Sequence, residues 1–168
     1  NQIDMPRDAF YANDPFGQRI LDGIEANSKL LTDDEIRRAR RAYYANVSYF
    51  DSKIGALVQT VEEMGQIDNT IFIVTADHGD MLGEKGLWYK MNFYEHSARV
   101  PLVIAGPGVV QGQTTNACSL VDLMPTMVEI GGGNSAMFGS LSDGRSLMSL
   151  ARGEDDSISE AVGEYCAE

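Results

Sequence analysis

Residues 70–80 have the sequence Thr-Ile-Phe-Ile-Val-Thr-Ala-Asp-His-Gly-Asp, an apolar run that ends in polar residues. A continuous β-branched and aromatic run without alternation predicts a strand covered on both faces, as in a parallel sheet with helices on either side. Residues 100–105, Val-Pro-Leu-Val-Ile-Ala, predict a second strand of this kind. Its Pro101 belongs at the first positions of the strand, where a missing N–H is tolerated.

Two helices are predicted around these strands. Thr32 and Glu35 have the spacing of a capping box, so a helix should begin there and end at Gly65. A shorter helix should run to residue 130, with Ser119 or Asp122 as its N-cap. In the long helix, apolar residues recur every three or four positions and predict one buried stripe: Ile36, Ala39, Tyr43, Tyr44, Val47, Phe50, Ile54, Leu57, Val58, Val61 and Met64.

The order helix, strand, loop, strand, helix over residues 32–133 predicts an α/β fold. Residues 1–31 are expected to be loop-rich with one short helical turn, and residues 134–168 to form a second loop-rich region. The chain begins without Met and ends without a polar tail, so we expect it to be a piece of a longer protein.

Composition excludes several classes of protein. The 168 residues include 13 Lys and Arg against 25 Asp and Glu, a net charge of −12, which excludes a basic nucleic-acid binder. No apolar run is long enough to span a membrane. Cys118 and Cys166 are too few and too far apart for a zinc knuckle or a disulfide framework, so both are expected to be thiols. A further run of basic residues is either a nucleic-acid patch or, as the net charge favours, a solvated helix face: Arg37, Arg38, Arg40 and Arg41.

Polar residues follow the first predicted strand directly. Ligands of open α/β sheets bind beyond the carboxyl ends of strands, and Gly79 gives Asp77 and His78 the freedom to converge on one ion. A carboxylate and an imidazole are competent metal ligands, although hydrogen bonds to a neighbouring turn are an equally open interpretation. Asp80 is a possible third ligand, but a solvated or capping role is favoured. Lys90, twelve residues after His78, is either a clamp for an anion or a surface lysine.

Residues 75–84, 90–91 and 94–102, followed by Asp-Gly-Arg-Ser-Leu at 143–147, together resemble the C-terminal half of the sulfatase family in the alkaline phosphatase superfamily. The resemblance implies an alkaline-phosphatase-like sheet flanked by helices, present here as a C-terminal fragment. It implies that Asp77 and His78 bind a divalent metal, usually calcium, and that Lys90 contacts the sulfate group. His96 and Arg99 also match the family, and we expect them to support the loop.

One family element is missing from this sequence. Sulfatases use a formylglycine nucleophile made from Cys or Ser in a C-x-[P/A]-x-R motif, and neither Cys118 nor Cys166 begins such a motif. We therefore expect the nucleophile in a missing N-terminal half. Calcium needs six to eight oxygen ligands, so the chain alone should be inactive and should bind metal weakly.

Among sulfatases, the chain most resembles the choline sulfatases, which implies hydrolysis of choline sulfate. Carboxylates and aromatic faces would hold a quaternary ammonium, and the sequence offers Glu164 and Glu168 for the first role. Aromatic residues, for which loop packing is favoured, are Trp88, Tyr89, Phe93 and Tyr94. A phosphonate or phosphate monoester hydrolase and a non-catalytic assembly module are alternatives. We expect a homo-oligomer with no nucleic-acid or membrane partner, in the cytoplasm or alternatively the periplasm.

Overall fold

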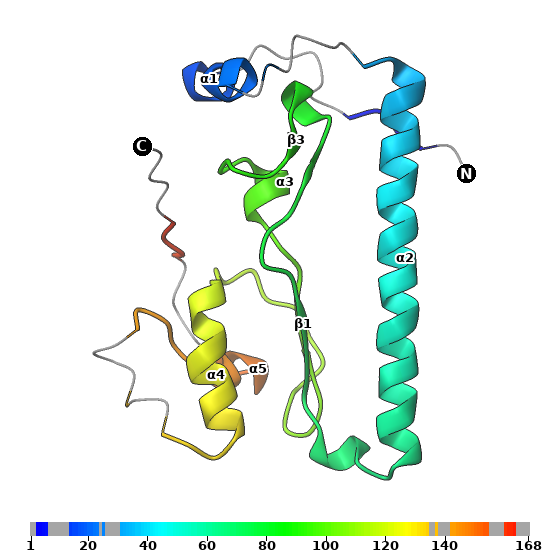
Figure 1. The fold of residues 1–168 in the computed structure, drawn as a ribbon. Helices are drawn as coiled ribbons and strands as arrows, with labels where there is room; N and C mark the ends of the chain where they lie inside the picture. The colour runs from blue at the N-terminus through cyan, green and yellow to red at the C-terminus, as the bar shows by residue number, and fades with distance from the viewer. Residues whose placement is uncertain are drawn as a thin grey trace. The chain divides into compact units, whose positions relative to one another are not determined.

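The computed structural model describes residues 3–6, 14–23, 25, 31–134, 137, 142–154 and 160–163. Helices and strands are both present and interspersed along the chain, consistent with the α/β prediction (Figure 1). The helices are α1 (Pro15–Gly23), α2 (Asp33–Glu63), α3 (Glu95–Ala98), α4 (Leu123–Ile130) and α5 (Met148–Ala151). The strands are β1 (Phe72–Thr75), β2 (Met81–Leu82), β3 (Trp88–Tyr89) and β4 (Leu102–Ala105). Short 3-10 turns are η2 (Ile67–Asn69), η3 (Glu84–Gly86) and η4 (Leu120–Asp122).

The chain divides into two compact units. The first unit comprises Asn1–Glu63 and Ala76–Pro101, and the second comprises Met64–Thr75 and Leu102–Glu168. The residues after β1 that the sequence marks as a candidate site therefore lie in the first unit, together with the long helix. No helix in the described part of the chain is both long and apolar enough to cross a bilayer.

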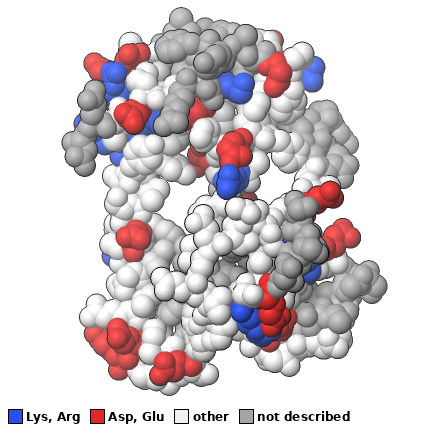
Figure 2. Space-filling view, turned by 180° about the vertical axis from the view of Figure 1, so that it is seen from behind, with Lys and Arg blue, Asp and Glu red and all other residues white. Residues whose placement is uncertain are grey.

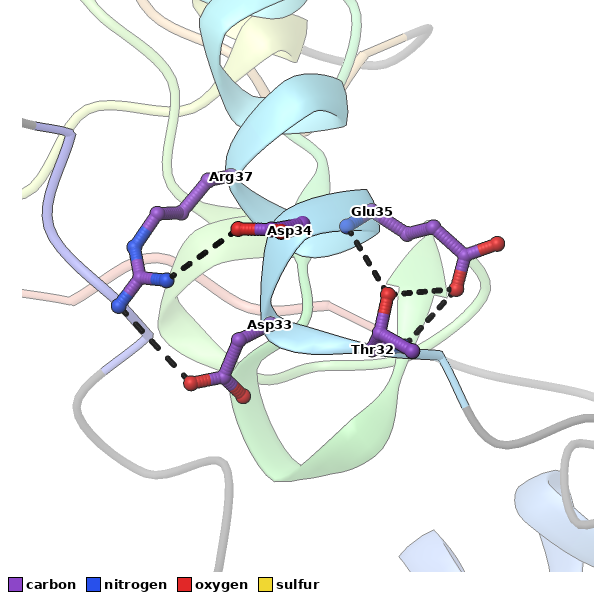
Figure 3. A network of polar contacts seen from close by, with 5 residues as sticks. All are labelled: Thr32, Asp33, Asp34, Glu35 and Arg37. Carbon is purple, nitrogen blue, oxygen red and sulfur yellow. Dashed lines mark hydrogen bonds and ion pairs between the residues drawn. The ribbon is translucent and has the colours of Figure 1, made fainter.

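The capping box at the start of α2 is confirmed. The Thr32 backbone N–H donates to Glu35 Oε2 at 2.9 Å, and the Glu35 N–H donates to Thr32 Oγ1 at 3.3 Å (Figure 3). Arg37 lies within 4 Å of two acids in the same turn, Asp33 and Asp34. Each Thr32 and Glu35 contact satisfies an N–H that has no partner within the helix, which is why the helix begins here.

The apolar stripe of α2 is not buried as predicted. Arg40 is the only buried residue among those of α2, whereas Val47, Phe50 and Leu57 are all more than half exposed. The periodicity correctly indicates which residues share a face of the helix. It cannot indicate whether that face becomes buried, and the exposed fractions of Val47, Phe50 and Leu57 show that these parts of it are not.

In the second unit, β1 pairs with β4 in antiparallel register, from Phe72 opposite Ala105 to Thr75 opposite Leu102. The expectation of a parallel pair covered on both faces is wrong for these two strands, since β4 alternates half-buried and exposed residues. The apolar runs indicated strands but not their direction, because an unbroken run carries no information about the partner. Strand β4 begins at Leu102, directly after Pro101, and not at Val100 as predicted.

The helix after β4 begins and ends as predicted. Ser119 and Asp122 form a capping box around η4, and α4 ends at Ile130 before Gly131. Two elements lie in regions expected to be mainly loop: α1 has nine residues, and α5 lies within the C-terminal region. Cys118 is a thiol whose Sγ lies 3.7 Å from the Asn116 carbonyl oxygen, and Cys166 lies outside the described residues.

The surface charge agrees with the acidic composition. On the face shown in Figure 2, basic side chains mostly lie beside acidic ones, and some acidic side chains gather without a basic neighbour. The described side chains form no broad basic patch on that face. The prediction that the arginine run is fully solvated is wrong at one position, since Arg40 is only 7% exposed.

Candidate functional site

The candidate site begins at the turn that follows β1 in the chain. The His78 N–H donates to Asp77 Oδ1 at 3.0 Å, and the Asp77 side chain is 85% exposed against 32% for His78. The Gly79 N–H donates to the Ser97 carbonyl oxygen of α3 at 2.8 Å. A Cβ at Gly79 would collide with the His96 carbonyl oxygen, so only glycine allows this close approach.

Hydrogen bonds orient the His78 imidazole. Its Nδ1 lies 2.8 Å from the Gly79 carbonyl oxygen, which can only accept, so Nδ1 carries the hydrogen. Its Nε2 lies 2.6 Å from Lys90 Nζ, and an ammonium can only donate, so Nε2 presents a lone pair to it. Asp77 Oδ2 lies 3.5 Å from the same Nε2. The imidazole atom that would bind a metal therefore faces both an ammonium and a carboxylate.

A short hairpin returns the chain to His78. Strands β2 and β3 pair with Met81 opposite Tyr89 and Leu82 opposite Trp88, so the next positions outward are Asp80 and Lys90. Gly83, with φ of 101°, forms the bend between the strands. The structure thus brings Asp77, His78 and Lys90 together in the first unit, although they span fourteen positions of the sequence.

The backbone on both sides of Lys90 is left-handed. Tyr89 has φ of 66° and Met91 has φ of 77°, values that bulky residues rarely adopt. Both side chains are largely exposed, at 77% and 65%, so apolar burial does not account for the conformation. Asn92, which is buried, holds the segment after Lys90 by accepting from the Tyr94 N–H at 3.0 Å. Sequence analysis missed Asn92, since a single amide in a loop carries no periodic signal.

Helix α2 makes two polar contacts beside the site. Burial raises the pKa of Tyr43, and the charge of Asp80 and a hydrogen bond to its carboxylate raise it further. The carboxylate of Asp80 therefore contacts Tyr43 of α2. Arg40 Nη1 lies 2.8 Å from Glu84 Oε1, and both side chains are more than nine-tenths buried. The sequence places Arg40 in a basic run and gives no sign of this partner, which is 44 residues away.

The remaining predicted residues lie around this centre or outside the described chain. His96 contributes its backbone to the Gly79 contact, and Arg99 forms an exposed ion pair with Glu95 at 2.7 Å. Glu95 raises the pKa of Arg99 through a hydrogen bond and its charge. Glu164 and Glu168 lie outside the described residues.

The aromatic residues of the loop divide into two kinds. Tyr89 and Phe93 are exposed, whereas Trp88 and Tyr94 are half-buried. Tyr94 packs against the small core of Leu21, Met81 and Leu87 and donates to Asp14 Oδ2 at 2.7 Å. Burial, together with Asp14, raises the pKa of Tyr94 to about 12. Tyr94 therefore fits loop packing, which leaves Tyr89 and Phe93 as the accessible aromatic faces.

The Asp77 and His78 side chains are of the types that bind a divalent metal, but two side chains are too few to hold one. Asp77 supplies carboxylate oxygens and His78 a neutral imidazole nitrogen, both common metal ligands. Among the described residues, no group of three or more His, Cys, Asp or Glu side chains is arranged to hold a metal. The pair can therefore form part of a metal site that further oxygen ligands would complete.

Comparison with known proteins identifies the family. The family model for sulfatases matches residues 7–133, which include α2, the predicted site and α4. The chain belongs to the sulfatase family. It is 42% identical over 155 residues to a choline-sulfatase of Rhizobium meliloti (strain 1021), a match that covers 92% of this chain and 30% of that protein.

Solved structures agree with this assignment. The phosphonate monoester hydrolase SpPMH from Silicibacter pomeroyi superposes with a TM-score of 0.67 and 34% identity, covering 77% of this chain and 25% of that one. BT4656, solved in complex with its substrate D-glucosamine-2-N,6-O-disulfate, superposes with a TM-score of 0.68 and 29% identity. The match covers 91% of this chain and 33% of BT4656. The sulfatase chain described here thus spans about a third or less of the length of these relatives.

Proposed function

We propose that this sulfatase chain is part of a hydrolase that cleaves a sulfate ester, with choline sulfate as its substrate. The observation that carries the proposal is the contact between Lys90 Nζ and His78 Nε2 at 2.6 Å, beside the Asp77 carboxylate. A cation and two metal-ligand side chains within one turn and one hairpin form the kind of site that binds a tetrahedral oxyanion. The identity to a choline-sulfatase supports the choice of ester.

In this proposal each residue has a separate role. Asp77 and His78 hold a divalent metal, for which calcium is the candidate, and such an ion neutralises sulfate charge and activates a nucleophile when bound. His78 is kept in the required tautomer by the Gly79 carbonyl oxygen. With a metal on the Nε2 lone pair of His78, Lys90 would no longer donate to that nitrogen and would donate to a sulfate oxygen as a compact positive charge. Tyr89 and Phe93 face the quaternary ammonium of choline, and Glu168 is a further candidate for that group.

The nucleophile and the remaining metal ligands are proposed to lie outside this sequence. A formylglycine residue supplies the nucleophile in the proposed enzyme, and neither cysteine of this chain begins its motif. The proposal therefore concerns the intact polypeptide that contains this chain, acting as a homo-oligomer, and expects the 168 residues alone to be inactive.

A second candidate function is hydrolysis of a phosphonate or phosphate monoester. It is favoured by the likeness to SpPMH, a phosphonate monoester hydrolase with a similar fold and 34% identity. The same metal ligands and lysine suit either tetrahedral anion, since both carry charged oxygens at a similar spacing.

Turnover by the intact polypeptide separates these functions. The expected result is faster release of sulfate from choline sulfate than of product from a phosphonate or phosphate monoester. Faster cleavage of the phosphorus ester would replace the first function by the second, and no turnover of any ester would overturn both. Elemental analysis adds a test of the metal role: Asp77→Asn should lower metal content, whereas Asp33→Asn, an exposed acid at the start of α2, should leave it unchanged.

A further inference from the structure

We infer that Arg40 and Glu84 are positioning residues, which hold the β2–β3 hairpin so that Lys90 meets His78. This inference rests on the proposed function for its effect on catalysis, but its structural part stands independently. Arg40 is buried in α2, and Glu84 is buried at the bend of the hairpin. Neither residue touches Asp77, His78 or Lys90 in any contact described above, so both would act through the backbone.

The ion pair occupies both backbone polar groups of Leu82. Glu84 Oε2 accepts from the Leu82 N–H at 2.6 Å, and Arg40 Nη1 donates to the Leu82 carbonyl oxygen at 2.9 Å. The same Arg40 nitrogen donates to Glu84 Oε1 at 2.8 Å. Two side chains from distant parts of the sequence therefore form a closed set of contacts around one residue of β2.

Leu82 needs these contacts because β3 does not supply them. The Gly83 N–H donates to the Leu87 carbonyl oxygen at 2.9 Å, so this pair is hydrogen-bonded across the hairpin. Hydrogen-bonded and non-hydrogen-bonded pairs alternate in antiparallel strands, so the N–H and C=O of Leu82, opposite Trp88, face away from β3. Glu84 and Arg40 take the place that a third strand would otherwise fill.

The position of Lys90 depends on the hairpin that this pair supports. Strands β2 and β3 have only two residues each, and a two-stranded hairpin of this length is not stable by itself. The register that places Lys90 beyond Tyr89, near His78, follows from the pairing of Met81 with Tyr89. Loss of the contacts to Leu82 would free the outer edge of β2, loosen this register and move the ammonium relative to the imidazole.

The charge state of Glu84 agrees with this role. Burial raises the pKa of Glu84, but hydrogen bonds from Arg40 and from the Leu82 N–H lower it more, and the net pKa lies below its ordinary value. The carboxylate is therefore ionised at neutral pH, where it accepts both hydrogen bonds. Arg40 Nη2 also donates to the Tyr44 hydroxyl at 3.3 Å, which further orients the guanidinium along α2.

The test combines amide hydrogen exchange with steady-state kinetics on the intact polypeptide. In the wild type, the Leu82 amide should be protected, although it has no partner in β3; an unprotected Leu82 amide would overturn the inference. Glu84→Gln should speed amide hydrogen exchange at Leu82 about tenfold or more, because the Leu82 N–H then donates to a neutral acceptor, which binds it more weakly than a charged one. Arg38→Met, on the same helix but exposed, is the matched control and should leave this exchange rate unchanged.

Kinetics distinguish positioning from a purely structural role. Glu84→Gln should lower kcat for the sulfate ester about tenfold with little change in KM, because a displaced Lys90 loses charge stabilisation in the transition state. Arg40→Lys, which keeps a cation, should retain more activity than Arg40→Met. Lower thermal stability with unchanged kcat would overturn the positioning role. If the wild type cleaves no ester, the proposed function fails, while the Leu82 exchange rates still decide the hairpin contact.

Discussion

The two units of the chain both use buried polar contacts, but of different kinds. In the first unit, Arg40 and Glu84 pair two charged side chains around the backbone of Leu82. In the second unit, Thr126 Oγ1 donates to the Asp122 carbonyl oxygen at 2.6 Å and accepts from the Leu147 N–H at 2.9 Å.

The second unit adds a carboxylate that accepts hydrogen bonds from two backbone N–H groups. Asp122 accepts from the Ser119 N–H at 2.8 Å and from the Arg145 N–H at 3.0 Å, so it connects the start of α4 to the segment before α5. A Cβ at Gly144 would collide with the Val121 carbonyl oxygen, which shows how closely the two segments approach. The loops of the second unit are thus held by a carboxylate and a hydroxyl that bind backbone groups, whereas the first unit places a buried ion pair beside the candidate site.

The largest expected effect concerns the site itself, which lies in the first unit. Lys90→Ala in the intact polypeptide should lower kcat for the sulfate ester by about a hundredfold or more, the usual loss for one donor to a developing oxyanion. The fold should remain, because the Lys90 side chain is exposed. Steady-state kinetics measure the effect, and Lys53→Ala, an exposed lysine of α2 that lies over the Tyr49 ring, is the control. Equal kinetics for the two variants would remove Lys90 from the site.

Stability should respond most strongly to loss of one charge in the first unit. Arg40→Met leaves the Glu84 carboxylate buried without its partner, and breaking such a pair costs about 3–5 kcal/mol in free energy of unfolding. Native-state hydrogen exchange of α2 and of the hairpin measures this change within the intact polypeptide. The double variant Arg40→Met/Glu84→Met should recover much of the loss, because neither buried charge remains. A loss of stability in Arg40→Met no larger than that in the exposed control Arg38→Met would contradict the difference between the two units.

The second unit should lose less from an equivalent deletion. Thr126→Val keeps the side-chain shape but leaves the buried Leu147 N–H without an acceptor, which costs about 1–3 kcal/mol. Thr114→Val is the matched control, because Thr114 is exposed and also accepts a backbone N–H, from Asn116 at 3.1 Å. The exposed substitution should stay within about 0.5 kcal/mol of wild type. Hydrogen exchange at Leu147 reports the change, and activity should fall far less than in Lys90→Ala.

The sequence predicts local structure in both units better than it predicts contacts between distant segments. The capping box at Thr32 and the caps at Ser119 and Asp122 follow from neighbouring residues, and the structure confirms them. The position of Asp77 and His78 after a strand also predicted that they lie together, but the approach of Lys90 to them depends on the β2–β3 register, which neighbouring residues do not reveal.

Burial and strand direction could not be read from the sequence. The ion pair of Arg40 with Glu84 joins positions 44 residues apart, and a basic run in an acidic chain indicates solvent exposure. Whether the stripe of α2 is covered, and whether β1 and β4 run parallel or antiparallel, depends on surfaces that periodicity does not describe. Local hydrogen bonding was therefore predictable, whereas tertiary pairing was not.

The smallest expected effect tests why substitutions in the first unit lower its stability: through the burial of charge, or through the loss of any hydrogen bond. Tyr94 donates to the exposed carboxylate of Asp14, and its pKa is about 12 against an ordinary value of 10.0. A raised pKa favours the neutral phenol in the fold, so this contact contributes fully below pH 10 and is lost as the pH rises through about 12.

Removal of the Asp14 charge should lower the pKa of Tyr94 towards its ordinary value. Asp14→Asn is suitable because asparagine still accepts the Gly17 N–H, at 2.8 Å in the wild type, and so preserves the start of α1. Ultraviolet absorbance of the phenolate follows the titration, with Asp22→Asn, an exposed acid of α1, as control. The accompanying loss of stability should be smaller than in Thr126→Val, because water replaces the partner at an exposed contact. A loss as large as in Arg40→Met would show that the hydrogen bond itself, and not the burial of charge, governs the stability of the first unit.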